Sequence, residues 1–179
     1  LSGMGFTYLA TGWINELSPR DGRLRLHAPI VGSAERRITG QVRYEVSVGS
    51  TAEKLNIAGN GHLAYEPTAA GLASASLTRR LYQDDPRLSV ERSQFQLEVV
   101  AENDSNQPIV NLSVAGGFQP GMLYELLYEA RNPVLAGAGM TAIRDMVSAI
   151  RFGDDAADEL SQLGLSDIES TVAWGNSQS

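Results

Sequence analysis

The sequence predicts a β-rich N-terminal region over residues 1–117, followed by a smaller α/β region over residues 118–179. Polar and apolar residues alternate repeatedly before residue 117, a pattern typical of half-buried antiparallel strands. The Pro/Gly-rich stretch Gly116–Gly121 then marks a change of character. An apolar run, an amphipathic helix and a second apolar run follow, which together predict a strand-helix-strand unit with parallel strands and a right-handed crossover. The expected fold class is therefore α/β with a β-rich N-terminal portion.

The composition limits the class of protein. The chain has 179 residues, of which 42% are hydrophobic and 20% charged, as in an ordinary globular protein. Its formal net charge of −7 argues against nucleic acid or an anionic membrane as a partner. No apolar run approaches the roughly 20 residues that a membrane-spanning helix needs. The sequence has no cysteine, which excludes disulfides, thiolate catalysis and cysteine-bound metals, but leaves cytoplasmic and secreted or periplasmic locations open.

The acidic excess lies in the last third of the chain. Residues 1–119 hold 11 Lys/Arg and 12 Asp/Glu, whereas residues 120–179 hold 3 and 9. The carboxylates at positions 154, 155, 158 and 159 predict a solvated helix face, because they lack the spacing of a calcium-binding loop. No cluster of metal-binding residues is visible, so neither a metal nor a cofactor is expected.

Several strands are predicted in the N-terminal region. Residues 5–14 are rich in aromatic and β-branched types, and residues 23–27 alternate strictly, which would turn Leu24 and Leu26 inward. A longer strand is predicted over residues 37–48. The side chains that it would place on one face are Val42, Tyr44, Val46 and Val48.

The rest of this region is predicted as follows. Residues 49–75 indicate an extended loop with a short strand near residues 62–65. Further strands are expected over residues 76–82, 94–100 and 109–114, separated by Asp/Asn-rich turns. The region would thus contain five to seven short antiparallel strands.

The second region begins with residues 122–130, whose weak alternation favours a strand buried on both faces. A loop over residues 131–139 leads into a helix that ends at Gly153. Its apolar stripe consists of Met140, Ile143, Met146, Val147 and Ile150. A short acidic helix over residues 155–163 and a strand over residues 168–174 complete the predicted unit.

The last six residues, Trp174-Gly-Asn-Ser-Gln-Ser179, read small-x-Ser-x-small. This is the pattern of a nucleophile elbow, in which a strand turns sharply into a helix and exposes a serine. Small residues are needed on both sides because the turn is strained, and Gly175 and Ser179 supply them. The spacing alone also occurs in ordinary loops, so the preceding segments decide its interpretation.

Three blocks carry a resemblance to a known family. They are Gly117-Phe-Gln-Pro-Gly-Met-Leu-Tyr-Glu-Leu-Leu-Tyr-Glu-Ala-Arg-Asn-Pro133, Gly137-Ala-Gly-Met-Thr-Ala-Ile-Arg-Asp145 and Gly175-Asn-Ser-Gln-Ser179. In this order they resemble blocks of the bacterial "alpha/beta hydrolase domain" proteins, which are serine-hydrolase-like chains with a strand-rich N-terminal portion. The resemblance implies the N-terminal part of an α/β-hydrolase fold that ends at the nucleophile elbow.

The resemblance also implies the site residues. Ser177 matches the nucleophile, and the backbone N–H of Gln178 matches the oxyanion donor that follows it. A second donor would come from either Gly116–Gly121 or Arg131–Gly139. The implied activity is hydrolysis of a small-molecule carboxylic ester through an acyl-serine intermediate.

One departure concerns the catalytic base. In this family the acid and then the histidine follow the serine, whereas His27 and His62 both precede Ser177. The acid and histidine are therefore expected on a segment beyond residue 179, in a second polypeptide or C-terminal fragment that completes the fold; the other explanation is a truncated, inactive module. Asp145 is expected to pair with Arg144, Arg151 or a loop N–H rather than to act in catalysis.

A second function class stays open. The chain could be a non-catalytic β-rich binding or assembly module in which Ser177 is incidental. A dinucleotide site is not expected, because Gly137-Ala-Gly139 lacks the third glycine and the acidic residue of that fingerprint.

Overall fold

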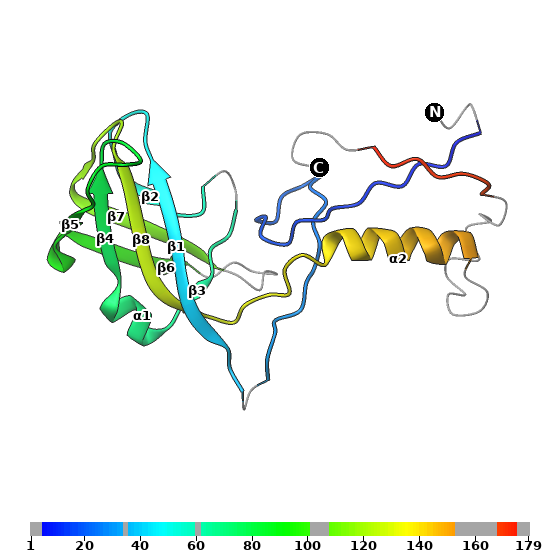
Figure 1. Ribbon diagram of the computed structural model, residues 1–179, viewed down its shortest axis with the longest axis horizontal. Coiled ribbons are helices and arrows are strands. Elements are labelled where there is room, and N and C mark those ends of the chain that lie inside the picture. Colours follow the sequence, from blue (N-terminus) through cyan, green and yellow to red (C-terminus); the bar gives the residue numbers. More distant parts are fainter. Residues whose placement is uncertain (1–4, 34–35, 60–61, 101–107, 153–167, 175–179) are drawn as a thin grey trace.

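The computed structural model describes residues 5–33, 36–59, 62–100, 108–152 and 168–174. Within these residues the chain forms two antiparallel β-sheets that pack face to face, and a longer helix that extends away from them (Figure 1). None of the helices in the described part of the chain has the length and apolar character to cross a membrane.

The first sheet has five strands, one of which is a long central strand. The central strand is β8 (Leu123–Arg131), which pairs with β1 (Thr39–Ser47) on one side and β4 (Ser76–Arg80) on the other. The short strand β5 (Leu88–Val90) extends the sheet beyond β4, and β3 (Glu66–Pro67) pairs with the last residues of β8. Every one of these pairs is antiparallel.

The second sheet has the order β2-β7-β6. Its central strand β7 (Ile109–Phe118) pairs antiparallel with β2 (Ala52–Asn56) and β6 (Phe95–Val100). The 3-10 helix η2 (Arg92–Gln94) precedes β6. A turn over residues 119–122 leads from β7 into β8 and so connects the central strands of the two sheets.

The core lies between the sheets and takes alternate residues from both. Tyr44 stacks on Tyr128 with ring centroids 5.9 Å apart, and Phe118 meets Tyr124 edge to face at 4.9 Å. The Tyr128 hydroxyl is satisfied by donating to the Tyr65 carbonyl at 2.7 Å. The largest fully buried side chains are Tyr124, Tyr128, Phe118, Leu77, Leu112, Leu126 and Val110.

The helix α1 (Ala69–Ser74) closes one end of the sandwich. Thr68 caps it, because its hydroxyl accepts a hydrogen bond from the Gly71 N–H at 2.8 Å. Gly71 is buried, and a Cβ at this position would collide with the Glu129 backbone of β8. Helix and strand therefore pack together only because position 71 has no side chain.

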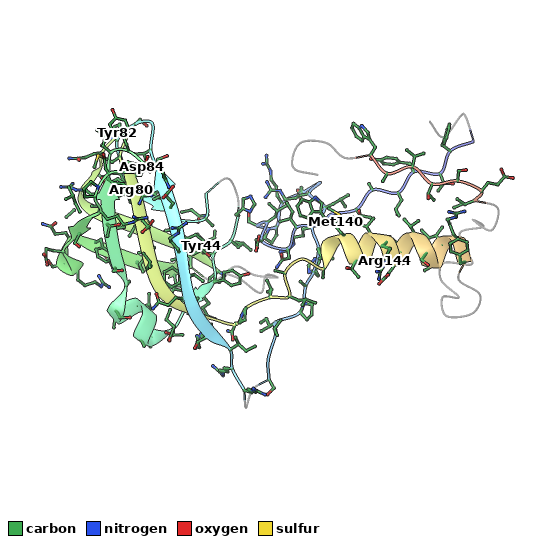
Figure 2. All side chains as sticks on the ribbon, viewed as in Figure 1. Tyr44, Arg80, Tyr82, Asp84, Met140 and Arg144 are labelled. Atoms are coloured by element: carbon green, nitrogen blue, oxygen red, sulfur yellow. The ribbon has the colours of Figure 1, made fainter. Side chains whose placement is uncertain are left out.

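The helix α2 (Gly139–Phe152) lies outside the sandwich, where Met140 and Arg144 are seen on it (Figure 2). At its start, a Cβ on Gly139 would collide with the Trp13 backbone, so the N-terminal segment packs closely on this turn. At its end, Arg151 Nη2 donates to the Glu169 carbonyl at 3.0 Å. Segments from both ends of the described chain thus contact α2.

The predicted α/β fold class is wrong. Antiparallel partners pair with both edges of β8, and residues 168–174 form no strand, so the parallel strand-helix-strand unit and the α/β-hydrolase fold are absent from the described residues. The weak alternation of polar and apolar residues in β8 had favoured a strand buried on both faces, as in a parallel sheet. It arises because Glu125, on the face away from the core, is buried by arginines while its neighbours on that face are half-buried, so neither face of this antiparallel strand is fully exposed.

Other predictions had mixed outcomes. Strands β1, β4, β6, β7 and β8 and helix α2 occur where the sequence predicts strands and a helix. Residues 6–14 and 23–27 are not strands, and Leu24 is 55% exposed instead of facing inward. Residues 49–75 hold β2, β3 and α1 rather than a loop with one short strand. The predicted helix over residues 155–163 lies outside the described residues.

Candidate functional site

The predicted catalytic residues Ser177 and Gln178 lie outside the described residues. The segment that leads to them, residues 168–174, is described and contains no regular secondary structure. Its side chains Val172 and Trp174 are 90% and 81% exposed. The described residues that bear on the candidate site are therefore this segment and the elements that it contacts.

The segment 168–174 is held beside α2. The hydrogen bond from Arg151 to the Glu169 carbonyl attaches its start to the last turn of the helix. In Figure 1 the segment, drawn in red, then runs back along α2 toward the N-terminal end of the helix. Seven extended residues span up to about 24 Å, and a 14-residue helix is about 21 Å long. The described part of this segment thus runs toward the end of α2 where Gly139 lies.

The loop that enters α2 lies at the same end. Backbone hydrogen bonds hold it to the segment around Ile30: Val31 N–H donates to the Pro133 carbonyl at 2.7 Å, and Leu135 N–H donates to the Pro29 carbonyl at 2.9 Å. The first-turn N–H groups of a helix have no partner within the helix and carry its positive dipole end. Such groups can stabilise an oxyanion, provided that the reacting carbonyl is brought to them.

The other loop considered for the second oxyanion donor is differently placed. The turn after β7 lies at the opposite end of β8 from Arg131. Its N–H groups are already used, because Gln119 donates to the Tyr124 hydroxyl at 2.9 Å and Gly121 donates to the Val48 carbonyl at 3.1 Å. This loop therefore makes structural contacts within the sandwich.

The remaining candidate residues have structural or solvent contacts. Asp145 accepts a hydrogen bond from Arg144 Nε at 2.7 Å, as the sequence suggested, and both side chains are mostly exposed. His62 lies in a backbone bridge with Leu17, and His27 is exposed next to the buried Ala28. These two histidines belong to different segments, and no contact between them is recorded among the described residues.

Large apolar side chains are exposed around α2. On the helix, Met140, Met146 and Phe152 are 54%, 40% and 68% exposed. The neighbouring extended segments add further members, which are Phe6, Tyr8, Leu9, Val172 and Trp174. We call these eight residues the α2 apolar surface. Exposed apolar side chains mark a surface that another polypeptide covers where they adjoin one another.

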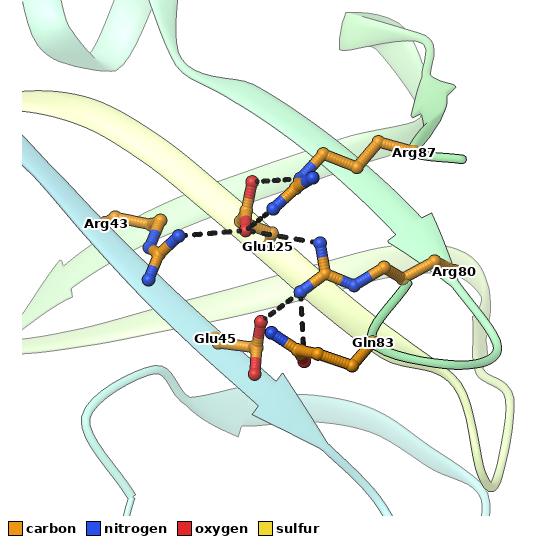
Figure 3. A network of polar contacts seen from close by, with 6 residues as sticks. All are labelled: Arg43, Glu45, Arg80, Gln83, Arg87 and Glu125. Carbon is orange, nitrogen blue, oxygen red and sulfur yellow. Dashed lines mark hydrogen bonds and ion pairs between the residues drawn. The ribbon is translucent and has the colours of Figure 1, made fainter. Parts of the chain in front are cut away.

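Sequence reasoning missed a charge network on the outer face of the first sheet (Figure 3). Glu125 is 6% exposed and receives two hydrogen bonds from Arg87, at 2.8 and 3.0 Å. Arg43 and Arg80 approach it at 3.5 Å, and Arg80 also pairs with Glu45 at 2.5 Å. A glutamate inside the apolar run of β8 was the available signal, since a buried carboxylate requires partners.

The charge network alters the acidity of its central residue. The hydrogen bonds from Arg87, together with the charges of Arg43 and Arg80, lower the pKa of Glu125 despite the opposing effect of burial. Glu125 is therefore a stable carboxylate at neutral pH. Its outer-face position and saturated contacts make it a structural group rather than a general base.

Comparison of the chain with models of protein families, with curated proteins and with solved structures found no match. Within the described part of the chain, no three acidic or histidine side chains are grouped so that they could hold a metal ion.

Proposed function

We propose that this chain carries the nucleophile of a serine hydrolase that acts on carboxylic esters. Ser177 Oγ would attack the ester carbonyl, the alcohol would leave with a proton, and water would then release the acid from the acyl-serine. The observation that carries the proposal is the sequence Gly175-Asn-Ser-Gln-Ser179, preceded in order by two further blocks that are similar to those of serine hydrolases.

The course of segment 168–174 supports one assignment of the oxyanion donors. It leads the chain toward the N-terminal end of α2 and the loop over residues 131–139. We therefore propose that this loop supplies the second donor, beside the N–H of Gln178. Removal of one such donor typically costs about 3 kcal/mol of transition-state stabilisation.

The proposal requires an acid and a histidine from another polypeptide segment. His27 and His62 lie in segments whose described contacts do not favour a catalytic role, and an unactivated serine is a weak nucleophile. The α2 apolar surface supports the proposal of a further polypeptide segment, because its large side chains are exposed on α2 and on the segment over residues 168–174, which precedes Ser177. The covering segment would bring the base to the serine.

The test measures hydrolysis of short p-nitrophenyl esters by the protein isolated with any polypeptide that copurifies. Ser177→Ala should lower the rate at least about a thousandfold, since it removes the covalent step. Ser179→Ala is the matched control, because alanine is also small and the rate should change less than about threefold. Equal rates for wild type and Ser177→Ala would contradict the proposal.

The alternative is a β-rich binding or assembly module, which the sandwich itself favours. The buried core and every sheet of the described residues belong to residues 39–131. If Ser177→Ala leaves esterase activity unchanged and the α2 apolar surface still retains a copurifying polypeptide, the module interpretation replaces the enzyme.

A further inference from the structure

A pocket lies where the first sheet meets the segment before β1. Its cavity volume is about 460 Å³, which is within the usual size range for small-molecule sites. The end of β8 supplies Arg131 and Asn132 to one wall. The remaining wall comes from residues 30–33 and from Arg37 and Ile38. The pocket is thus built from two parts of the chain that are far apart in the sequence.

Two arginines give the pocket a positive charge. Arg131 pairs with Glu66 at 2.5 Å, which also accepts a hydrogen bond from Asn132 Nδ2 at 2.8 Å. The guanidinium of Arg37 forms no ion pair with any side chain in the described residues, although its charge acts on Glu66. Among the described residues around the pocket, one carboxylate therefore faces two guanidinium groups, which leaves a surplus of one positive charge in the described part of the wall.

The wall that β8 supplies has two further features. The Nε atom of Arg131 is buried and has no hydrogen-bond partner among the described residues. Because this atom is not accessible from the pocket, Arg131 would attract an anion through the charge of its guanidinium group and not through a hydrogen bond from Nε. Asn132 has its backbone in the left-handed region, with φ of 56°, a conformation that asparagine adopts more readily than most other non-glycine residues.

The rest of the wall is apolar. Ile30, Val31 and Ile38 line the pocket and are 42%, 38% and 42% exposed. Three branched aliphatic side chains beside an arginine provide contact area for a short hydrocarbon group. The pocket therefore combines an anion-binding end with an apolar one.

We propose that this pocket binds a small monocarboxylate whose carboxylate pairs with Arg37 and whose hydrocarbon group packs on Ile30, Val31 and Ile38. A single negative charge matches the single surplus positive charge. The planar carboxylate also fits the paired donors of a guanidinium group. The proposal rests on the residues that line this pocket and not on the esterase activity.

Isothermal titration of the 179-residue chain with hexanoate tests the proposal. Hexanamide has the same hydrocarbon group without the charge and should bind about tenfold more weakly, and acetate should also bind about tenfold more weakly because it lacks most of the apolar contact. Hexanoate binding that matches hexanamide or acetate would overturn the proposal. Absence of hexanoate binding up to about 10 mM would overturn it as well.

Variants locate the binding site. Arg37→Gln should weaken hexanoate binding about tenfold, whereas Arg36→Gln removes the same charge from the adjacent position, does not line the pocket, and should change the affinity less than about twofold. Both residues are exposed, and circular dichroism should show that both variants keep the wild-type fold. Equal weakening by the two substitutions would show general charge attraction and would overturn the assigned site.

Discussion

Glu45 and Glu125 lie directly opposite each other across β1 and β8, and Arg80 bridges the two carboxylates. Like charges in this position destabilise a sheet unless cations neutralise them. The side chain of Arg80 is only 2% exposed, and Arg43 and Arg87 add two further positive charges. The pairing of β1 with β8 therefore depends on a network of five charged side chains.

The first prediction concerns the centre of this network. Glu125→Gln should lower the free energy of unfolding by about 2 kcal/mol, because it removes one of the two carboxylates beside the buried Arg80 and the charge that accepts two hydrogen bonds from Arg87. Urea unfolding followed by circular dichroism measures the change. The control is Glu98→Gln, which removes a glutamate that pairs with Lys54 on the exposed surface and should cost less than about 1 kcal/mol. An equal effect of both substitutions would contradict the structural role of Glu125.

The second prediction concerns acid. The pKa of Glu125 is lowered by Arg87 and that of Glu66 by Arg131, so each ionised carboxylate stabilises the folded state. This contribution is complete above the unfolded-state pKa of about 4.3 and is lost as pH falls through the lower folded-state values. Urea unfolding at a series of pH values from 7 to 3 should show this loss, and Glu125→Gln should reduce its size. A variant with the full wild-type loss would contradict the assignment.

The third prediction concerns alkali. Burial raises the pKa of Tyr128 and also that of Tyr44, so the folded state holds both hydroxyls neutral. Their contribution is complete below the unfolded-state pKa of about 10 and is lost as pH rises beyond it. The free energy of unfolding should therefore fall between pH 9 and 11, and Tyr128→Phe should make the fall shallower. An unchanged slope in this variant would count against the neutral buried hydroxyl.

The fourth prediction concerns the packing of α1. Gly71→Ala should destabilise the chain by about 2 kcal/mol, because the new methyl group meets the Glu129 backbone, which cannot move without disturbing β8. Gly40→Ala is the control, since a Cβ there has open space and the stability should change by less than about 0.5 kcal/mol. Thermal unfolding compares the two variants. A tolerated Gly71→Ala would mean that α1 does not pack on β8 as described.

The sequence predicts those elements whose apolar residues recur with the period of a strand or of a helix. The alternation of Val42, Tyr44 and Val46 located β1, and the apolar stripe on α2 located that helix, because both patterns follow from local geometry. Which strands pair with each other does not follow from these local patterns. Whether β8 has parallel or antiparallel neighbours is decided by segments distant in the sequence. Residues 168–174 pair with no strand in the part of the chain that the structure describes, despite their strand-like composition.

The candidate sites were predictable to different degrees. The serine motif is local, so the sequence reveals it directly. The carboxylate pocket was not predictable, because Arg37 and Arg131 are brought together only when β1 pairs with β8. The network around Glu125 was not predictable either, because its three arginines come from two different strands and a loop that are distant in the sequence.

Labelling with a fluorophosphonate probe tests the central claim, that Ser177 is a nucleophile, most directly. The protein should be labelled as isolated, together with any copurifying polypeptide, and the modified residue located by peptide mass spectrometry. We predict a phosphonylated peptide that carries the label on Ser177, and no label at this position after Ser177→Ala or after prior treatment with an ester-derived acylating inhibitor. An unlabelled Ser177 in the wild-type protein, under conditions in which a known serine hydrolase reacts completely, would contradict the claim.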